Sequence, residues 1–444
     1  MTVSEASDVK HAFINWKILA IVSFAVFSAH YGVGDLIFPI FLGRMTGANW
    51  VLGALGYALI NSGLVFLGYL VVVYRGKSLF SLSEMILGRE FAYVYTSIAM
   101  LILSVLFILP RVASATYSMA FALFYPQVPL WVFLILYFAI NYYIVYSRPK
   151  VFDKLGLYIA PALLLFILIV FIAGIIHPLS SPIEPGSPTA LADGVLNAYN
   201  TMNGLAAALM GLWIMNEFRR RGIKEREEMF KNVVITGGIV AIFLAFTSTV
   251  EVYIGATSGA KFPEAAIGEL TVNIVRGLLG PAGTAIFAIL LALACITTSA
   301  GVLSTAGDVF EEMSKGKMKY KWTMIWGNIV GYFIGLAGLQ AVINYAVPWL
   351  MLIYPAFIVM IAFHLVKKFE SVKLAAQAGV ITAIFFSIGD WLQALGVGTN
   401  PFTTMNLKMP GGNMGLAWLL PTIVVAAVVQ VASILIKRAG SGNK

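Results

Sequence analysis

Long apolar stretches follow one another along almost the whole chain of 444 residues. A helix that spans the hydrocarbon core of a membrane needs about 20 mostly apolar residues. No segment between the stretches is long enough for a folded soluble domain, so we expect an all-α integral membrane protein. The predicted transmembrane helices, about twelve in number, cover residues 17–42, 50–74, 93–124, 128–147, 155–176, 193–217, 232–256, 282–306, 322–340, 344–366, 372–397 and 416–437.

The composition excludes several other classes of protein. Hydrophobic residues make up 60% of the chain and charged residues 11%. Soluble proteins average about 45–50% apolar and about 25% charged residues. These values exclude a soluble multidomain enzyme, a disordered protein and a small secreted scaffold. Cys295 is the only cysteine, so no internal disulfide can form.

The positive charges indicate the orientation in the membrane. With both termini in the cytoplasm, most of the 29 Lys and Arg residues fall in cytoplasmic segments. Only Arg44, Lys261, Arg276 and Lys408 fall outside, as the positive-inside rule requires. The net charge of +9 therefore needs no nucleic-acid partner. We expect a multi-pass protein of the cytoplasmic membrane, with the lipid bilayer as its partner.

Two of the predicted spans contain residues that interrupt helices. The first span includes residues 28–39 (SAHYGVGDLIFP), and the sixth includes residues 197–208 (NAYNTMNGLAAA). Interrupted spans at corresponding positions of two halves point to a transporter with inverted repeats. The two spans lie five apart, which places the copies in opposite orientations. We expect broken helices in both, and close glycine packing between neighbouring helices is the alternative.

Five of the ionisable residues in or near the spans carry expectations. A carboxylate at mid-membrane costs at least about 2.5–3.5 kcal/mol, so Asp35 is expected to line a cavity, form a pair or carry a coupling ion. His30 either relays protons or bonds a backbone carbonyl. Arg111 is expected to pair within the protein rather than contact substrate. Glu251 is expected to reach water near the outer end of its span, and His364 to be solvated at a cytoplasmic end.

The eighth predicted span carries three consecutive hydroxyl side chains, Thr297, Thr298 and Ser299. Such hydroxyls usually bond to carbonyls of the preceding turn of their own helix. Alternatively, Thr297 and Thr298 join carbonyls of the first span around a dehydrated Na⁺, because hard cations prefer oxygen ligands.

Segments from the first to the tenth span resemble the branched-chain amino acid:cation symporters of bacteria and archaea, the LIVCS family. The resemblance implies the broken-helix fold of the leucine transporter and the APC superfamily. It divides the chain into a cytoplasmic segment (1–16), two inverted five-helix repeats (17–176 and 177–366), and two additional helices with a cytoplasmic C-terminus (367–444). The motifs that carry it are residues 32–39 (GVGDLIFP), 109–117 (LPRVASATY), 150–156 (KVFDKLG), 201–207 (TMNGLAA), 293–298 (LACITT) and 353–355 (IYP).

The chain departs from the family pattern at Ile40, where the family tends to have a second proline, at Ser118, where it tends to have an acid, and at one pair of positions in the broken helices. The family usually has Asn where this chain has Asp35, and Asp where it has Asn203. We infer that the two residues face each other across the two broken helices and share one negative charge.

The resemblance also implies cation sites by position. One Na⁺ lies between the first and eighth spans, and a second cation position falls near Asp35 and Thr201. The ligands implied for the first site are the backbone carbonyls near Ser28 and Tyr31, the carbonyl of Ala294, and the hydroxyls of Thr297 and Thr298.

The substrate site follows from the same resemblance. The substrate carboxylate would meet N–H groups of one broken helix, and its ammonium would meet carbonyls of the other. The residues implied are Gly32, Val33 and Gly34 for the carboxylate, Asn200, Thr201 and Asn203 for the ammonium, with Asp35 beside them, and Tyr117 and Ala207 for an aliphatic side chain.

We therefore expect a secondary active transporter that imports branched-chain amino acids with Na⁺ by alternating access. One alternative is transport of another small amino acid or amine with H⁺, in which Asp35 and His30 are the coupling residues. A transporter-like sensor without net flux is another. The chain contains no H-E-x-x-H, no G-x-S-x-G and no complete Walker A motif, so we expect neither an enzyme nor a cofactor.

Overall fold

The computed structural model describes residues 15–147, 150–398 and 400–441, and all of its regular elements are helices. Most of the N-terminal segment predicted to be cytoplasmic lies outside these residues. The α-helices are α1 (Trp16–His30), α2 (Val33–Thr46), α3 (Trp50–Ala58), α4 (Val65–Arg75), α5 (Leu79–Leu87), α6 (Arg89–Leu101), α7 (Ile108–Met119), α8 (Leu130–Ser147), α9 (Lys150–Ile176), α10 (Ala190–Tyr199), α11 (Asn203–Arg220), α12 (Arg226–Ala256), α13 (Ile267–Met313), α14 (Tyr320–Gly335), α15 (Leu339–His364), α16 (Lys373–Ala394), α17 (Pro401–Leu407) and α18 (Leu419–Ser441).

Each predicted span coincides with one of these helices or with a pair of them. Seven helical stretches in the described part of the chain are long and apolar enough to cross a membrane, by length and composition. Three helical segments were not predicted, because each is too short to fill a window of about 20 residues. They are α5, α17 and the part of α13 before its kink at Gly280 (φ 67°, ψ −168°).

The first predicted span is interrupted, as expected. Helix α1 ends at His30 and α2 begins at Val33. Between them, Tyr31 (φ −77°, ψ 89°) and Gly32 (φ −119°, ψ −168°) leave the helical conformation. Pro39 lies inside α2 and does not interrupt it.

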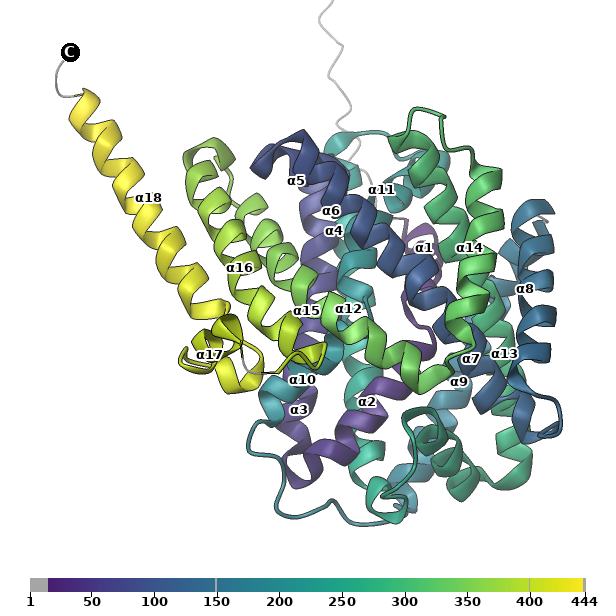
Figure 1. The fold of residues 1–444 in the computed structure, drawn as a ribbon. Coiled ribbons are helices and arrows are strands. Elements are labelled where there is room, and N and C mark those ends of the chain that lie inside the picture. Colours follow the sequence, from purple (N-terminus) through teal and green to yellow (C-terminus); the bar gives the residue numbers. More distant parts are fainter. Residues whose placement is uncertain (1–14, 148–149, 399, 442–444) are drawn as a thin grey trace, which may run out of the picture.

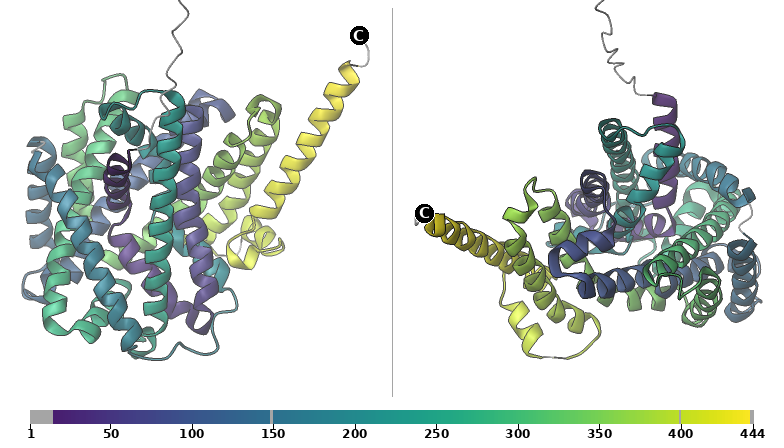
Figure 2. Two further views of the ribbon diagram at one scale, coloured as in Figure 1. Left: turned by 180° about the vertical axis from the view of Figure 1, so that it is seen from behind. Right: turned by 90° about the horizontal axis from the view of Figure 1, so that it is seen from above.

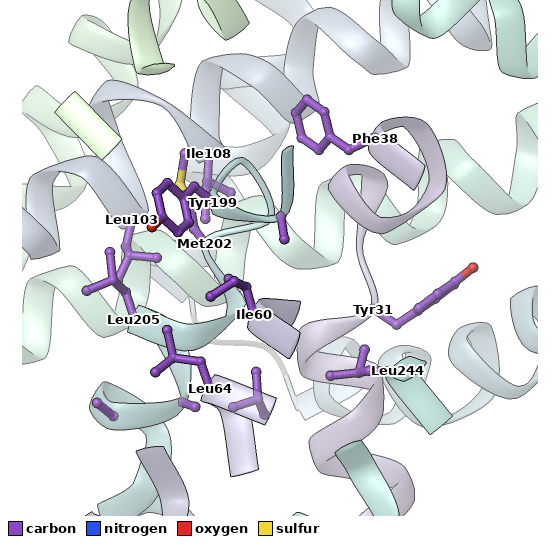
Figure 3. Packing of buried hydrophobic residues seen from close by; sticks show 14 of the residues in the cluster. Tyr31, Phe38, Ile60, Leu64, Leu103, Ile108, Tyr199, Met202, Leu205 and Leu244 are labelled. Carbon is purple, nitrogen blue, oxygen red and sulfur yellow. The ribbon is translucent and has the colours of Figure 1, made fainter. Parts of the chain in front are cut away.

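The sixth predicted span is interrupted in the same way. Helix α10 ends at Tyr199 and α11 begins at Asn203. Met202 has a left-handed backbone conformation (φ 63°, ψ 8°), which a residue other than glycine adopts only at a cost. Figure 3 shows Met202 and Tyr199 packed near Leu103 and Leu205, so this break is embedded in the apolar core.

Two π-helical turns interrupt further helices without a matching signal in the sequence. One spans Leu59–Leu64 between α3 and α4, and the other spans Ile102–Leu106 between α6 and α7. A π turn inside an α-helix often marks a functional site. The first of these turns presents Asn61 to the centre of the protein.

Glycines allow some of the helices to cross with their backbones in contact. A Cβ atom on Gly43 of α2 would lie 2.0 Å from the carbonyl oxygen of Val252 in α12. Conversely, a Cβ atom on Gly255 of α12 would lie 2.0 Å from the carbonyl oxygen of Ile40 in α2. Small residues commonly bring membrane helices this close. The backbones of α2 and α12 therefore pack in direct contact at two reciprocal glycine positions.

The helices that contain the breaks lie in the middle of the molecule (Figure 1). Helices α8 and α14 form one flank, and α16 and α18 form the opposite flank. Helix α18 leans away from the body of the protein in all three views (Figures 1 and 2). The helices that surround the breaks are therefore α1–α4, α7, α10–α13 and α15.

Candidate functional site

One side chain from each broken helix meets the other in the centre of the protein. The Asn203 amide Nδ2 donates a hydrogen bond to the Asp35 carboxylate Oδ1 at 2.9 Å. The exposed fractions of the two residues are 3% for Asp35 and 4% for Asn203. This contact confirms the inference that Asp35 and Asn203 face each other across the two breaks.

A second amide, which the sequence analysis missed, completes this contact. Asn61 donates from Nδ2 to Asp35 Oδ1 at 3.1 Å, and its own Oδ1 accepts from Asn203 Nδ2 at 2.9 Å. Asn61 is fully buried on the π turn between α3 and α4. Its only signal in the sequence is an Asn-Ser pair at mid-span.

His30 extends the network from the end of α1. Its Nδ1 lies 3.2 Å from Asn203 Oδ1, and its Nε2 bonds to the hydroxyl of Tyr69 on α4. An amide oxygen can only accept, so Nδ1 carries the proton and Nε2 accepts from the Tyr69 hydroxyl. The neutral imidazole thus connects Tyr69 to Asn203, and through Asn203 to Asp35. His30 bonds side chains rather than the backbone carbonyl considered from the sequence.

Arg111 of α7 also lies at both breaks. Its Nη1 donates to the carbonyl oxygen of Asn200 at 2.6 Å, and its guanidinium lies 5.3 Å from the centre of the Phe38 ring. Nη2 approaches the first turn of α2, 3.1 Å from where a Cβ atom on Gly34 would stand. In the described part of the chain no carboxylate forms an ion pair with it. The expected internal partner of Arg111 is therefore a backbone carbonyl at the end of α10.

The ends of the half-helices have the polarity that a zwitterion requires. Val33 and Gly34 lie in the first turn of α2, where backbone N–H groups have no intrahelical acceptor. The Gly32 N–H is directed at Asp35 Oδ2, at 3.4 Å. On the other break, Thr201 donates from Oγ1 to the Ala198 carbonyl at 2.8 Å, at the negative end of α10.

The two threonines of α13 differ in their surroundings. Thr297 donates from Oγ1 to the carbonyls of Leu293 at 3.1 Å and Ala294 at 2.9 Å, which is the usual bond to the preceding turn. Thr298 faces the first break, because its Oγ1 lies 4.0 Å from where a Cβ atom on Gly32 would stand. The structure thus brings Thr298, but not the hydroxyl of Thr297, next to the α1–α2 break.

Two expectations about solvated ionisable groups are wrong. Glu251 is 2% exposed and accepts a hydrogen bond from the Tyr31 hydroxyl, because α12 packs against the first break at this level. His364 is 0% exposed, and its Nε2 lies 2.9 Å from the Leu82 carbonyl. Leu82 belongs to α5, a helix that the sequence analysis did not predict, and this helix covers His364.

The residues expected around an aliphatic side chain lie in different places. Tyr117 donates from its hydroxyl to the Val128 carbonyl at 2.9 Å, and its ring lies against Phe121 and Phe133. This aromatic cluster is separate from the main core around the breaks. Ala207 is buried in α11 and faces Gly68 of α4.

The site combines several kinds of polar group. Within the described ranges, no group of three His, Cys, Asp or Glu side chains is placed to hold a metal ion. Cys295, the one cysteine, is buried and free. The site instead combines one carboxylate, two amides, one imidazole, one guanidinium and the ends of two half-helices.

The comparison with protein families covers almost the whole chain. The sequence model of the family described as "Branched-chain amino acid transport protein" matches residues 15–436. The chain belongs to this family. The branched-chain amino acid permease BrnQ of Lactobacillus delbrueckii subsp. lactis is 27% identical over 434 residues, with 94% of this chain and 97% of that protein covered.

Other members of the family are about equally similar. The permease BraB of Bacillus subtilis is 28% identical over 426 residues, with 94% of this chain and 95% of that protein covered. The branched-chain amino acid transport system 2 carrier protein of Pseudomonas aeruginosa is 28% identical over 431 residues, with 95% and 97% covered.

Solved structures of two other transporters have the same fold. Mhp1, a nucleobase-cation-symport-1 family transporter in a closed conformation with bromovinylhydantoin bound, superimposes with a TM-score of 0.62. It is 13% identical, and 93% of this chain and 91% of Mhp1 are covered. A manganese transporter of Eremococcus coleocola has a TM-score of 0.57 and is 14% identical, with 99% and 98% covered. At these sequence identities, the likeness to the two structures establishes only the fold of this chain.

Proposed function

We propose that this protein is a secondary active transporter that moves branched-chain aliphatic amino acids into the cell together with a cation. The observation that carries the proposal is the hydrogen bond between Asp35 and Asn203, which joins the two interrupted helices around a single buried charge. Buried ionisable residues in membrane proteins usually serve a substrate or ion pathway. The names of the relatives supply the substrate class.

The proposed substrate site lies between the two breaks. The amino acid would place its carboxylate at the positive end of α2, near Gly32, Val33 and Gly34. Its ammonium would meet the negative end of α10, at the carbonyls of Asn200 and Thr201. Both ends of the zwitterion then face the half-helix end of opposite sign. Tyr117 is not part of this proposal, because its hydroxyl and ring are engaged in the aromatic cluster beside α8.

The architecture that goes with this function has twelve membrane crossings. We place the two inverted five-helix repeats at residues 17–176 and 177–366, between the N-terminal segment 1–16 and the additional helices in 367–444. Both termini are proposed to be cytoplasmic. Support comes from the matching positions of the two breaks and from the place of α16 and α18 at one flank (Figure 1).

The proposed coupling ion is Na⁺, bound between the first break and α13. Its ligands would be the hydroxyl of Thr298 and backbone carbonyls near Ser28, Tyr31 and Ala294. One charge moved through a potential of ~100 mV yields about 2.3 kcal/mol, which supports roughly 40-fold accumulation. In alternating access, the cation and the amino acid together would favour the inward-moving state more than either does alone.

Proton coupling is the alternative that a specific observation favours. Tyr69, His30 and Asn203 form a chain of hydrogen bonds that ends at Asp35. The chain places an imidazole, which can take up a proton, one side chain away from the buried carboxylate; the Asn203 amide links the two without itself passing a proton. H⁺ would then replace Na⁺ as the coupling ion, and Asp35 would bind it.

Uptake by proteoliposomes tests the proposal. The full-length protein is reconstituted, and uptake of labelled leucine, isoleucine and valine is followed under an imposed Na⁺ gradient or an imposed pH gradient. We expect uptake of all three that requires inward Na⁺. Uptake that follows the pH gradient alone favours coupling through Asp35. Saturable binding without accumulation indicates a sensor, and neither binding nor uptake by folded protein contradicts the proposed substrate.

Substitution of the two α13 threonines separates a cation ligand from an ordinary helix hydroxyl. Thr298→Ala is expected to raise the Na⁺ concentration for half-maximal uptake at least tenfold, because a hydrogen-bonding or ligating group lost from a charged partner costs about 1.5–3 kcal/mol. The matched variant Thr297→Ala is expected to change it less than about threefold, since that hydroxyl bonds its own helix. Equal effects of the two variants would contradict the proposed Na⁺ position.

A further inference from the structure

We infer that Arg111 binds the carboxylate of the transported amino acid through its Nε and Nη2 atoms, while the side-chain oxygen of Asn200 accepts from the ammonium. This inference rests on the proposed function and extends it. It assigns the recognition of both charged ends of the substrate to two side chains that contact each other. Around the two breaks, buried hydrogen-bonding atoms of Arg111 and Asn200 remain unpaired among the described residues.

The guanidinium of Arg111 is held in place by one of its nitrogens. Nη1 donates to the Asn200 carbonyl at 2.6 Å, and the ring of Phe38 lies against the plane of the group. Nε is buried, and it has no hydrogen-bond partner in the described part of the protein. Nε and Nη2 form one edge of the planar group, with two parallel N–H bonds. This edge is therefore oriented by contacts on the opposite side of the guanidinium.

The same edge of another arginine in this protein holds a carboxylate. Arg221 donates from Nε at 3.0 Å and from Nη2 at 2.9 Å to Oε1 of Glu217. Paired donation from arginine to a carboxylate is among the strongest and most directional interactions in proteins. The Nε and Nη2 atoms of Arg111 offer an equivalent pair of donors, without an acceptor among the described residues to take the Nε hydrogen.

The surroundings of this edge favour an anion. Nη2 lies 3.1 Å from where a Cβ atom on Gly34 would stand, so the edge is next to the first turn of α2. The unpaired backbone N–H groups of that turn add positive potential at the same place. Asp35, the residue after Gly34, interacts electrostatically with the guanidinium, but no ion pair joins the two among the described residues. A buried guanidinium without a paired carboxylate is costly inside a membrane protein. An anionic ligand at this position would satisfy the side chain and the helix end together.

The residue that holds Arg111 also has an unpaired acceptor. The side-chain oxygen Oδ1 of Asn200 is buried and lacks a hydrogen-bond donor within the described ranges. The backbone carbonyl of the same residue holds Arg111. Unpaired buried polar atoms are rare in native proteins and point to a missing partner. Arg111 offers a donor and Asn200, in contact with it, offers an acceptor. An amino acid carries the matching groups on one Cα atom: a carboxylate for the donor and an ammonium for the acceptor.

An alternative role for Arg111 is purely positional: it would hold α10 against α7 and never touch the substrate. The two roles predict different responses to ligands that lack the carboxylate charge. Leucine and leucinamide differ at that one group, and both keep the ammonium and the aliphatic side chain. The preference for leucine over leucinamide therefore reports on carboxylate recognition separately from the integrity of the site.

The test measures equilibrium binding of both ligands to the purified full-length protein. Wild-type protein is expected to bind leucine at least 100-fold more tightly than leucinamide. In Arg111→Gln, leucine binding is expected to weaken about 100-fold, while leucinamide binding changes less than about threefold. Arg44→Gln is the matched control, because Arg44 also donates only to carbonyls, those of Phe262, Pro263 and Ala265. Its preference for leucine is expected to stay at the wild-type value.

Four results would overturn the inference. Wild-type protein that binds leucinamide as tightly as leucine needs no carboxylate receptor. Equal weakening of both ligands in Arg111→Gln assigns Arg111 the positional role. If Arg111→Gln does not fold, Arg111→Lys keeps the charge without the paired edge, and an unchanged preference for leucine in that variant also overturns the inference. Wild-type protein that binds none of the three branched-chain amino acids overturns the proposed function and the inference with it.

Discussion

Replacing Asp35 by Asn is expected to lower the uptake of branched-chain amino acids at least 100-fold. The variant keeps the shape of the side chain but removes the charge that Asn61 and Asn203 both face with their amide hydrogens. Three amides then share the position, and none offers a cation or proton a counter-charge. The measurement is the initial rate of uptake in proteoliposomes, normalised to the amount of monodisperse protein.

A charge exchange provides the decisive second variant. The double substitution Asp35→Asn with Asn203→Asp moves the carboxylate to the other broken helix, which is the arrangement implied by the resemblance to the family. The two positions are in direct hydrogen-bond contact, so the exchange leaves one carboxylate at nearly the same point. We expect uptake to recover to within about tenfold of wild type, a coupling energy of about 1.4 kcal/mol or more relative to the single variant.

Another buried Asp–Asn pair in the same chain serves as the control. Asp390 of α16 accepts from Asn406 Nδ2 at 2.9 Å, in the flank that contains α17. Asp390→Asn removes a buried charge in a similar bond that involves neither broken helix, and is expected to leave uptake within about threefold of wild type. If Asp35→Asn transports as well as Asp390→Asn, the proposed role of the central charge is wrong.

The second large effect is expected from a single methyl group on α12. In Gly255→Ala the new Cβ atom would stand 2.0 Å from the carbonyl oxygen of Ile40, so α2 and α12 must move apart. Overpacking typically costs about 1–3 kcal/mol, and a backbone oxygen cannot swing aside as a side chain can. We expect a loss of about 3 kcal/mol or more in stability. The measurement is the temperature at which half of the detergent-solubilised protein loses its monodisperse peak.

The matched control lies on the same helix. A Cβ atom on Gly238 would meet nothing within 4 Å. Gly238→Ala is therefore expected to leave the stability unchanged or to raise it slightly, because alanine favours the helix by up to about 1 kcal/mol over glycine. Similar melting of Gly255→Ala and wild type would show that α2 and α12 are not held by the glycine crossing.

The sequence predicts the long helices and both breaks for physical reasons. A run of about 20 apolar residues has few alternatives to a membrane helix, and Gly32, Asp35, Asn200 and Asn203 have no place in an uninterrupted one. The non-helical segments contain fewer residues than the polar motifs that predicted them. Asp35 and Pro39 are helical, since an acid in the first turn and a proline are both tolerated once α2 has begun.

The parts that sequence reasoning missed depend on tertiary contacts. Asn61 joins the site because a π turn directs it inward, and no residue type by itself specifies such a turn. Glu251 is buried by the packing of α12 against the first break, and His364 by a helix too short for the membrane window. Burial of a polar side chain depends on which helices pack together, and a single sequence does not state that.

The two breaks have different mechanical properties. At the second break, Met202 is buried in a left-handed conformation, Arg111 clamps the Asn200 carbonyl, and Thr201 bonds the end of α10. At the first, a Cβ atom on Gly32 would meet only Thr298 Oγ1, 4.0 Å away. We therefore expect α10 and α11 to act as a stiff frame during the proposed transport cycle, while α1 swings about Gly32 once the bonds of Tyr31 to Glu251 and of His30 to Asn203 and Tyr69 have opened. The two broken helices occupy matching positions in the chain, yet one of them would move and the other would stay fixed.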